Sequence, residues 1–260
     1  MLQVNEDVFN LNKVNKIYAI GAGKATYPLA VALEEILGDR ITDGFIAIKK
    51  GQQNPFSGML GTLSRLRVAE SAHPVPDETS LAAGKEIWRI AEKAGQGDMV
   101  FCLMSGGVSA QSVYPAEGLS FNDKVTINQL LVHCGADVTE IMTVRRHLSR
   151  IKGGRLAPRM LPATIISLTV SDVKTDSMEW NTDWTSPDST TLADAEKSLK
   201  KYGLWQNVSE QVRNYLSTPT LEKETPKSFP NEPLHYCMVV KTRELWQGAA
   251  GKSKELGLSP

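Results

Sequence analysis

Met99-Val-Phe-Cys-Leu-Met-Ser-Gly-Gly-Val-Ser109 is the stretch that decides the predicted fold. It starts with an apolar run, residues 99–104, and changes abruptly to serine and glycine at residues 105–107. An unbroken apolar run of this length is typical of a central strand in a parallel sheet, because such a strand is covered on both faces. The small polar residues then predict a loop at the carboxyl end of that strand.

Apolar runs and amphipathic segments alternate on both sides of this stretch. Five further strands are predicted at residues 16–20, 45–48, 66–69, 163–170 and 236–240. Helices are predicted near residues 29–37, 80–94, 120–131, 137–151, 191–202, 208–216 and 242–256. Alternating strands and helices predict an α/β protein with a doubly wound, largely parallel sheet and helices on both faces.

We expect a single domain over residues 1–260, with residues 217–232 as a loop or crossing linker. The chain carries 29 acidic and 29 basic residues, a balance that favours neither a nucleic-acid interface nor a charge-driven membrane anchor. Its three cysteines lack paired spacing, and no apolar run approaches the roughly 20 residues that span a bilayer. The N-terminus lacks a signal-peptide pattern, so we expect a soluble, cytoplasmic protein.

Three polar segments fall at the predicted carboxyl ends of strands. They are residues 21–24, 105–109 and 171–176. In doubly wound sheets, ligands bind just beyond the carboxyl ends of the strands. We therefore expect these three segments to converge on one binding site.

The first segment, Gly21-Ala-Gly-Lys24, joins a strand to a helix. Gly21 and Gly23 would let backbone N–H groups approach an anion, and Lys24 would add a full positive charge. The spacing is not that of a Walker P-loop, and Thr26 occupies the place of the third glycine in a dinucleotide fingerprint. The alternative is a plain turn with a solvated lysine.

The second segment repeats this arrangement after the strand at residues 99–104. Ser105, Gly106, Gly107 and Ser109 offer two glycines flanked by two hydroxyl groups, which suits a phosphate or carboxylate. The Gly-x-Ser-x-Gly pattern of a serine nucleophile is missing. The alternative is again a simple turn.

The third segment places two carboxylates, Asp172 and Asp176, just past a strand. Mg²⁺ in phosphate-binding sites is held by one or two carboxylates and keeps several waters. One of the two could instead accept a hydroxyl proton. Aspartate and serine are also common turn formers, which is the structural alternative.

A basic cluster lies between the second and third segments, in residues 144–155. Arg145, Lys152 and Arg155 are its candidate ligands for a bound anion, and His147 is a weaker one. Such a density of cations in a neutral chain favours an anion site. The alternative is that some of these side chains complement a helix dipole, with the glycines at 153 and 154 ending that helix.

Five motifs of this sequence occur in the same order and spacing as in a known family. They are Gly21-Ala-Gly-Lys-Ala25, Glu70-Ser-Ala-His-Pro-Val-Pro-Asp77, Ser105-Gly-Gly-Val-Ser-Ala110, Val144-Arg-Arg-His-Leu-Ser-Arg-Ile-Lys-Gly-Gly-Arg-Leu-Ala157 and Ser171-Asp-Val173. From about Lys16 to Leu258 the chain resembles the type II glycerate kinases. The resemblance implies a Rossmann-like N-terminal domain and a smaller C-terminal domain, which this sequence does not include.

The resemblance also implies an activity, the Mg²⁺-dependent transfer of a phosphoryl group from ATP to the 2-hydroxyl of D-glycerate. Lys24 matches the family's active-site lysine, and Asp172 or Asp176 its acidic position. Phosphoryl transfer needs cations on the moving phosphate, and the carboxylate of glycerate needs another, for which Arg155 or Lys152 is a candidate. Either a partner chain carries the C-terminal domain or the sequence derives from a longer protein, and an exposed cleft face suggests that copies of the chain could associate.

The sequence departs from the family's pattern at three places. Thr182-Asp-Trp-Thr185 stands where the family has Ser-Gly-Pro-Thr, so Asp183 adds a negative charge and Trp184 adds bulk beside the expected anion site. Met142 replaces a usual asparagine, and Thr175 a usual glycine. The identity of the hydroxy acid is therefore left open.

Two other functions are compatible with these motifs. The chain could be a non-catalytic, kinase-derived subunit or anion-binding module that keeps the cleft without the chemistry. A nicotinamide-dependent hydroxypyruvate reductase fits less well, because the third glycine is missing and the basic cluster suits phosphate or carboxylate. Turnover of ATP with D-glycerate separates these alternatives.

Overall fold

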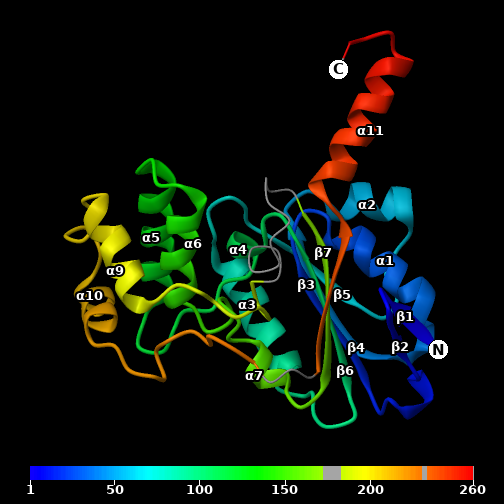
Figure 1. The fold of residues 1–260 in the computed structure, drawn as a ribbon, viewed down its shortest axis with the longest axis horizontal. Helices are drawn as coiled ribbons and strands as arrows, with labels where there is room; N and C mark the ends of the chain where they lie inside the picture. The colour runs from blue at the N-terminus through cyan, green and yellow to red at the C-terminus, as the bar shows by residue number, and fades with distance from the viewer. Residues whose placement is uncertain (172–182, 230–232, 260) are drawn as a thin grey trace.

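The computed structural model describes residues 1–171, 183–229 and 233–259 of the chain and is built around one six-stranded sheet (Figure 1). The strands are β3 (Ile17–Ala22), β4 (Ile41–Lys49), β5 (Arg67–Ser71), β6 (Met99–Ser105), β7 (Thr164–Val170) and β8 (Leu234–Val240). They pair in the order β5-β4-β3-β6-β7-β8, and every pair is parallel. A short antiparallel hairpin of β1 (Leu2–Val4) and β2 (Asp7–Phe9) lies beside it.

Alternate residues of the strands supply two separate cores, one on each face of the sheet. In β3, Ile17 and Ala19 join the core that includes α1 (Thr26–Leu37), whereas Tyr18 and Ile20 face the opposite way. The second core contains α3 (Glu78–Ala91) and α7 (Ala157–Met160). Both faces are therefore covered, which confirms the predicted doubly wound α/β fold.

A third core lies away from the sheet and consists of residues from four helices and the loops beside them. It joins α5 (Phe121–His133), α6 (Val138–His147), α9 (Leu192–Lys201) and α10 (Glu210–Ser217). Figure 1 shows these four helices grouped to one side of the sheet. The sequence predicted the individual helices but not that they pack into one helical lobe. An amphipathic pattern shows that one face of a helix is buried, but it does not show which element covers that face. A single domain over the whole chain stays a prediction.

The predicted helix ends needed two corrections. α3 begins at Glu78 rather than at Ser80, because Asp77 is the N-cap and Ser80 completes its capping box. α6 ends at His147 rather than near residue 151, so the glycines at 153 and 154 do not end a helix. The predicted pair of Ser120 and Asp123 is confirmed as the cap of α5.

The remaining elements are short helices and one helix that projects from the sheet. They are α2 (Gln53–Leu60), α4 (Val108–Gln111), α11 (Thr242–Glu255) and the 3-10 helices Leu11–Lys13 and Gly38–Arg40. Figure 1 shows α11 extending away from the end of β8. Within the described residues, no helix has both the length and the apolar character that a membrane span requires.

Candidate active site

The order of the strands reverses between β3 and β6. From β3 the chain runs outward through β4 to β5, and it then crosses back to place β6 on the other side of β3. At such a switch point the loops after the two strands diverge to opposite faces of the sheet and leave room for a ligand. The two loops at this point are residues 23–25 and residues 106–107, which belong to the first two predicted segments.

These two loops are hydrogen-bonded to each other. The Lys24 backbone N–H donates to the Gly106 carbonyl at 2.8 Å, and the Ala25 N–H donates to Ser105 Oγ at 2.9 Å. Ser105 Oγ is also 3.3 Å from the hydroxyl of Thr26. The predicted convergence of the first two segments is thereby confirmed, with Lys24 half-buried where they meet.

Gly23 permits this close approach. Its φ is +138°, and a Cβ at this position would lie 2.1 Å from Ser105 Oγ and 2.7 Å from the Ser105 carbonyl oxygen. No side chain fits there, so the glycine is required by the contact as well as by the backbone conformation. The turn itself is shorter than predicted, because Gly21 still belongs to β3.

Gln111 connects a third strand end to the same place. Its Oε1 accepts from the Gly23 N–H at 3.0 Å, and its carbonyl accepts from the Ser71 hydroxyl at 2.7 Å. A Cβ on Gly107 would approach His73 Cδ2 to 3.1 Å, so the segment after β5 also reaches this loop. Sequence reasoning missed Gln111, because α4 was not predicted and no motif marks the residue.

The third predicted segment begins next to β6. Val170 pairs with Ser105, and the buried Ser171 donates its N–H to the Val240 carbonyl at 2.9 Å. Asp172 and Asp176 lie outside the described residues. Among the residues that are described, no group of three or more histidine, cysteine or acidic side chains could hold a metal ion.

Of the basic cluster, Lys152 is buried against the residue that follows α4, and Arg145 is half-buried. Lys152 is 1% exposed, and its Nζ donates to the Ser112 carbonyl at 2.8 Å. Burial lowers the pKa of Lys152 to about 8, against the opposing attraction of Asp183. Burial likewise lowers the pKa of Arg145 to about 10. Lys152 is thus connected to the second loop through the residue that follows α4.

Lys124, which the sequence did not single out, belongs to the same buried group. Its ammonium donates to the Arg145 carbonyl at 3.0 Å. Burial, and then repulsion from Lys152, lowers its pKa well below the usual value. The helical position of Lys124 gave no signal of this role, because a lysine in a surface helix is ordinarily solvated.

Asp183 and Trp184 do not occupy the site in the way expected from the sequence. Asp183 is buried, and its Oδ1 accepts from Arg146 Nε at 2.8 Å and from the Gly153 N–H at 3.2 Å. Arg146 also reaches Asp188 at 3.2 Å. Trp184 is fully buried in the core under α3 and α7. The negative charge is therefore paired internally, and the added bulk fills the core.

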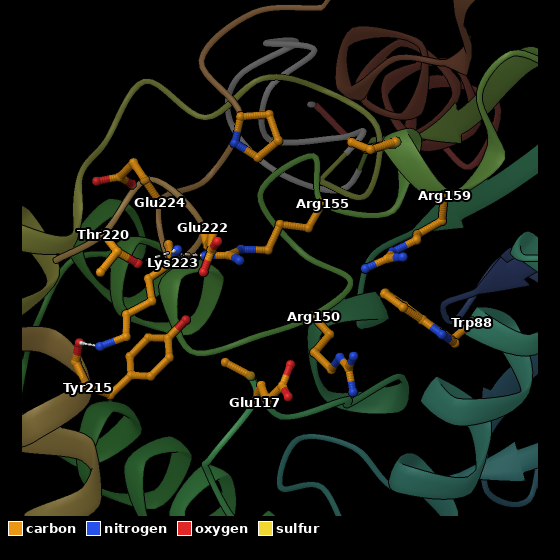
Figure 2. Close-up of a pocket in the computed structure, with 13 residues that line it drawn as sticks. Trp88, Glu117, Arg150, Arg155, Arg159, Tyr215, Thr220, Glu222, Lys223 and Glu224 are labelled. Carbon is orange, nitrogen blue, oxygen red and sulfur yellow. Dashed lines mark hydrogen bonds between the residues drawn. The ribbon is translucent and has the colours of Figure 1, made fainter. Parts of the chain in front are cut away.

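Arg155 is not brought to the strand ends. It lines a cavity of about 600 Å³, and its Nη2 donates to the Lys223 carbonyl (Figure 2). Neither Lys24 nor any of residues 105–109 lines that cavity. The structure thus brings Gly21, Gly23, Lys24 and the second segment together at the strand ends, and it places Arg155 elsewhere.

Comparisons with known proteins agree on one family. A family described as a domain of unknown function, DUF4147, matches residues 1–217. The chain is 36% identical to a glycerate 2-kinase of Pyrococcus horikoshii over 93% of its length, and 32% identical to a D-glycerate 2-kinase of Thermotoga maritima over 98%. The crystal structure of a glycerate kinase from Thermotoga maritima superposes with a TM-score of 0.78 at 31% identity, over 95% of this chain and 56% of that one.

The chain spans little more than half the length of these relatives. It covers 53% of the Pyrococcus protein and 58% of the Thermotoga protein. The similarity therefore extends over nearly all of this chain and only part of each kinase.

Proposed function

This chain belongs to the DUF4147 family and is a homologue of the glycerate 2-kinases, and on that premise we propose that it carries out ATP-dependent phosphoryl transfer to the 2-hydroxyl of D-glycerate or a related small hydroxy acid. The observation that carries the proposal is the pair of hydrogen-bonded loops at the switch point between β3 and β6. A kinase needs a preformed site of this kind, because its catalysis is mainly positioning and charge stabilisation.

Lys24 would supply the positive charge on the transferring phosphoryl group. It lies in the turn of residues 23–25, and its backbone is fixed by the bond to Gly106. A lysine placed in this way acts as a point charge on a phosphate. In the second loop, Ser109 Oγ is buried without a partner in the part of the chain that is described, so it could donate to the same ligand.

Asp172 and Asp176 would hold Mg²⁺ or orient the substrate hydroxyl. The support for this role is their position in the sequence directly after β7, whose Val170 pairs with Ser105 of β6. When bound, Mg²⁺ would neutralise charge on the phosphates. Lys152 and Arg145 would contribute a positive electrostatic field at the bound phosphates rather than a direct contact.

The proposed activity concerns the whole cleft around the hydroxy acid, and this chain matches only part of each kinase. The kinases it resembles are nearly twice as long, so we propose that residues of a further domain complete the cleft around the hydroxy acid. The comparisons name glycerate kinases and, for two relatives from Agrobacterium vitis at 37% identity, putative hydroxypyruvate reductases, and they give no support to the alternative of a non-catalytic subunit.

The direct test is turnover of ATP with D-glycerate and Mg²⁺, measured for the chain alone and with the C-terminal half of the Thermotoga enzyme added. We expect Lys24→Ala to reduce turnover by about a hundredfold or more, since removing a preorganised charge from the transition state costs several kcal/mol. The fold should persist, because Lys24 lies in a half-buried turn and contributes little packing.

Lys24→Arg is the matched control, since it keeps the charge and alters only its geometry. Turnover that is unchanged in Lys24→Ala would remove this lysine from the mechanism. ATP binding without turnover under both conditions would instead favour the non-catalytic alternative.

A further inference from the structure

The cavity that Arg155 lines is separate from the loops at the switch point and is lined by three arginines. It lies between the α3 and α7 face of the sheet and the helical lobe and has a volume of about 600 Å³. Figure 2 shows Arg150, Arg155 and Arg159 around one opening, with Trp88 on one side and Tyr215 on the other. Trp88 is near the end of α3 and α7 precedes β7, so this cavity lies toward the amino ends of the strands.

We propose that this cavity binds a small polyhydroxylated organic phosphate, of the sugar-phosphate class, at a site separate from the proposed phosphoryl-transfer site. The inference stands independently of the proposed kinase activity, because none of the residues at the switch point lines the cavity. It rests on the donors of the arginines, the size of the cavity and the acceptors at its rim.

The three guanidinium groups are held in place without neutralising partners. Arg150 and Arg159 lie 4.9 and 4.6 Å from the centre of the Trp88 ring. Stacking on an aromatic ring uses the face of a guanidinium and leaves the N–H groups at its edge available. Among the described residues, none of the three arginines is in an ion pair with a carboxylate.

Arg155 adds a third donor group from another direction. Its Nη2 donates to the Lys223 carbonyl, and its Nε is buried without a partner in the described part of the chain. A planar carboxylate engages one guanidinium in bidentate fashion, whereas a phosphate presents at least three oxygens in three directions. Three arginines of one short segment, residues 150–159, line the same cavity and present N–H groups in different directions, which matches a phosphate better.

The remaining walls of the cavity suit the hydroxyl groups of a ligand rather than a stacked nucleobase. The cavity is much larger than a phosphate ion and has the size of a small-ligand site. The Trp88 ring is already occupied by two guanidinium groups, and Lys223 lies 5.0 Å from the Tyr215 ring. Glu117 and Glu222, both exposed and in no ion pair among the described residues, offer acceptors for hydroxyl groups.

The test is calorimetric titration of the purified 260-residue chain with ribose 5-phosphate, glucose 6-phosphate and glycerol 3-phosphate. Ribose serves as the probe without a phosphate. We expect at least one of the phosphates to bind and ribose to show no binding. The double variant Arg150→Gln/Arg159→Gln should weaken binding by roughly 10- to 100-fold, as expected for the loss of charge-assisted hydrogen bonds.

Lys197→Gln is the matched control, because it removes one positive charge from an exposed position of α9 away from the cavity. It should bind as the parent does, and so should Lys24→Ala. If the double variant fails to fold, Arg159→Gln alone provides the measurement, because Arg159 is exposed. Absence of binding by all three phosphates at millimolar concentration would overturn the proposal. Binding that is lost in Lys24→Ala and kept in the arginine variants would also overturn it.

Discussion

The loops at the switch point and the basic cluster of residues 144–155 were both predicted to bind anions. In the structure, the charged side chains of these two regions have different surroundings. At the switch point, two loops are held by backbone hydrogen bonds and by Gln111, which leaves Lys24 half-buried at their junction. In the basic cluster, Arg146 is neutralised by Asp183 and Lys152 is satisfied by a carbonyl group. A density of cations in a sequence therefore indicates buried structural pairs as readily as it indicates a ligand site.

The largest expected effect concerns the buried ion pair in the basic cluster. Replacing Asp183 with alanine leaves Arg146 with Asp188 as its described carboxylate partner and removes the acceptor of the Gly153 N–H. Breaking a buried pair from one side costs about 3–5 kcal/mol, and the Asp188 carboxylate that stays beside Arg146 places the expected loss toward the lower end of that range. We expect the free energy of unfolding, measured by urea denaturation, to fall by about this amount.

Asp183→Asn is the matched comparison, since it keeps the shape and the acceptor but loses the charge. It should fall between the parent and Asp183→Ala. If Asp183→Ala unfolds at the same urea concentration as the parent, the basic cluster is not held together by this pair.

A smaller effect is expected from the pH dependence of Lys152. Its pKa in the folded chain is about 8 because burial disfavours the ammonium, whereas the ordinary value is 10.5. Between these values the unfolded chain binds more protons, so raising the pH stabilises the folded chain. From pH 7 to pH 9.5 this one group contributes about 2 kcal/mol of increasing stability.

The measurement is urea denaturation of the parent and of Lys152→Met at both pH values. The difference between the two proteins isolates this lysine from the other titrating groups. Parallel pH dependence in parent and variant would show that Lys152 has an ordinary pKa and is not desolvated.

The most local of these effects on stability is expected at the switch point. In Gly23→Ala a methyl group would overlap Ser105 Oγ, and the backbone would be held at an unfavourable φ. We expect a loss of about 1–3 kcal/mol, because the loops can separate to relieve the overlap. The loss should be local, visible as faster hydrogen exchange at Lys24 and Ala25 with little change in the global unfolding transition.

Gly38→Ala is the control for a glycine with positive φ, since no atom lies within 4 Å of a Cβ at that position. Similar exchange rates at Lys24 in Gly23→Ala and in the parent would show that the two loops do not depend on this contact.

The same contrast shows which parts of the fold could be predicted from the sequence. The strands were predicted because each is a short segment rich in apolar or β-branched residues, and in a doubly wound sheet their carboxyl ends must share one edge. Local pattern was therefore enough to place Lys24 beside Ser105. The assignment of Asp172 and Asp176 stays a prediction, because these residues lie outside the described part of the chain.

The roles of the buried polar residues could not be predicted, because they depend on partners far along the chain. Arg146 pairs with a residue 37 positions away, and Gln111 accepts from one 88 positions away. No spacing rule links such residues. For the same reason, Asp183 was expected beside the anion site and was found neutralised in the interior.

The central claim, that the loops after β3 and β6 form one nucleotide site, is tested most directly by hydrogen exchange of the parent chain with and without a non-hydrolysable ATP analogue and Mg²⁺. We predict slower exchange on binding in both residues 22–26 and residues 105–110, and a much smaller change around Arg155. Slower exchange confined to only one of the two loops, or found instead around Arg155 and Tyr215, would contradict the account.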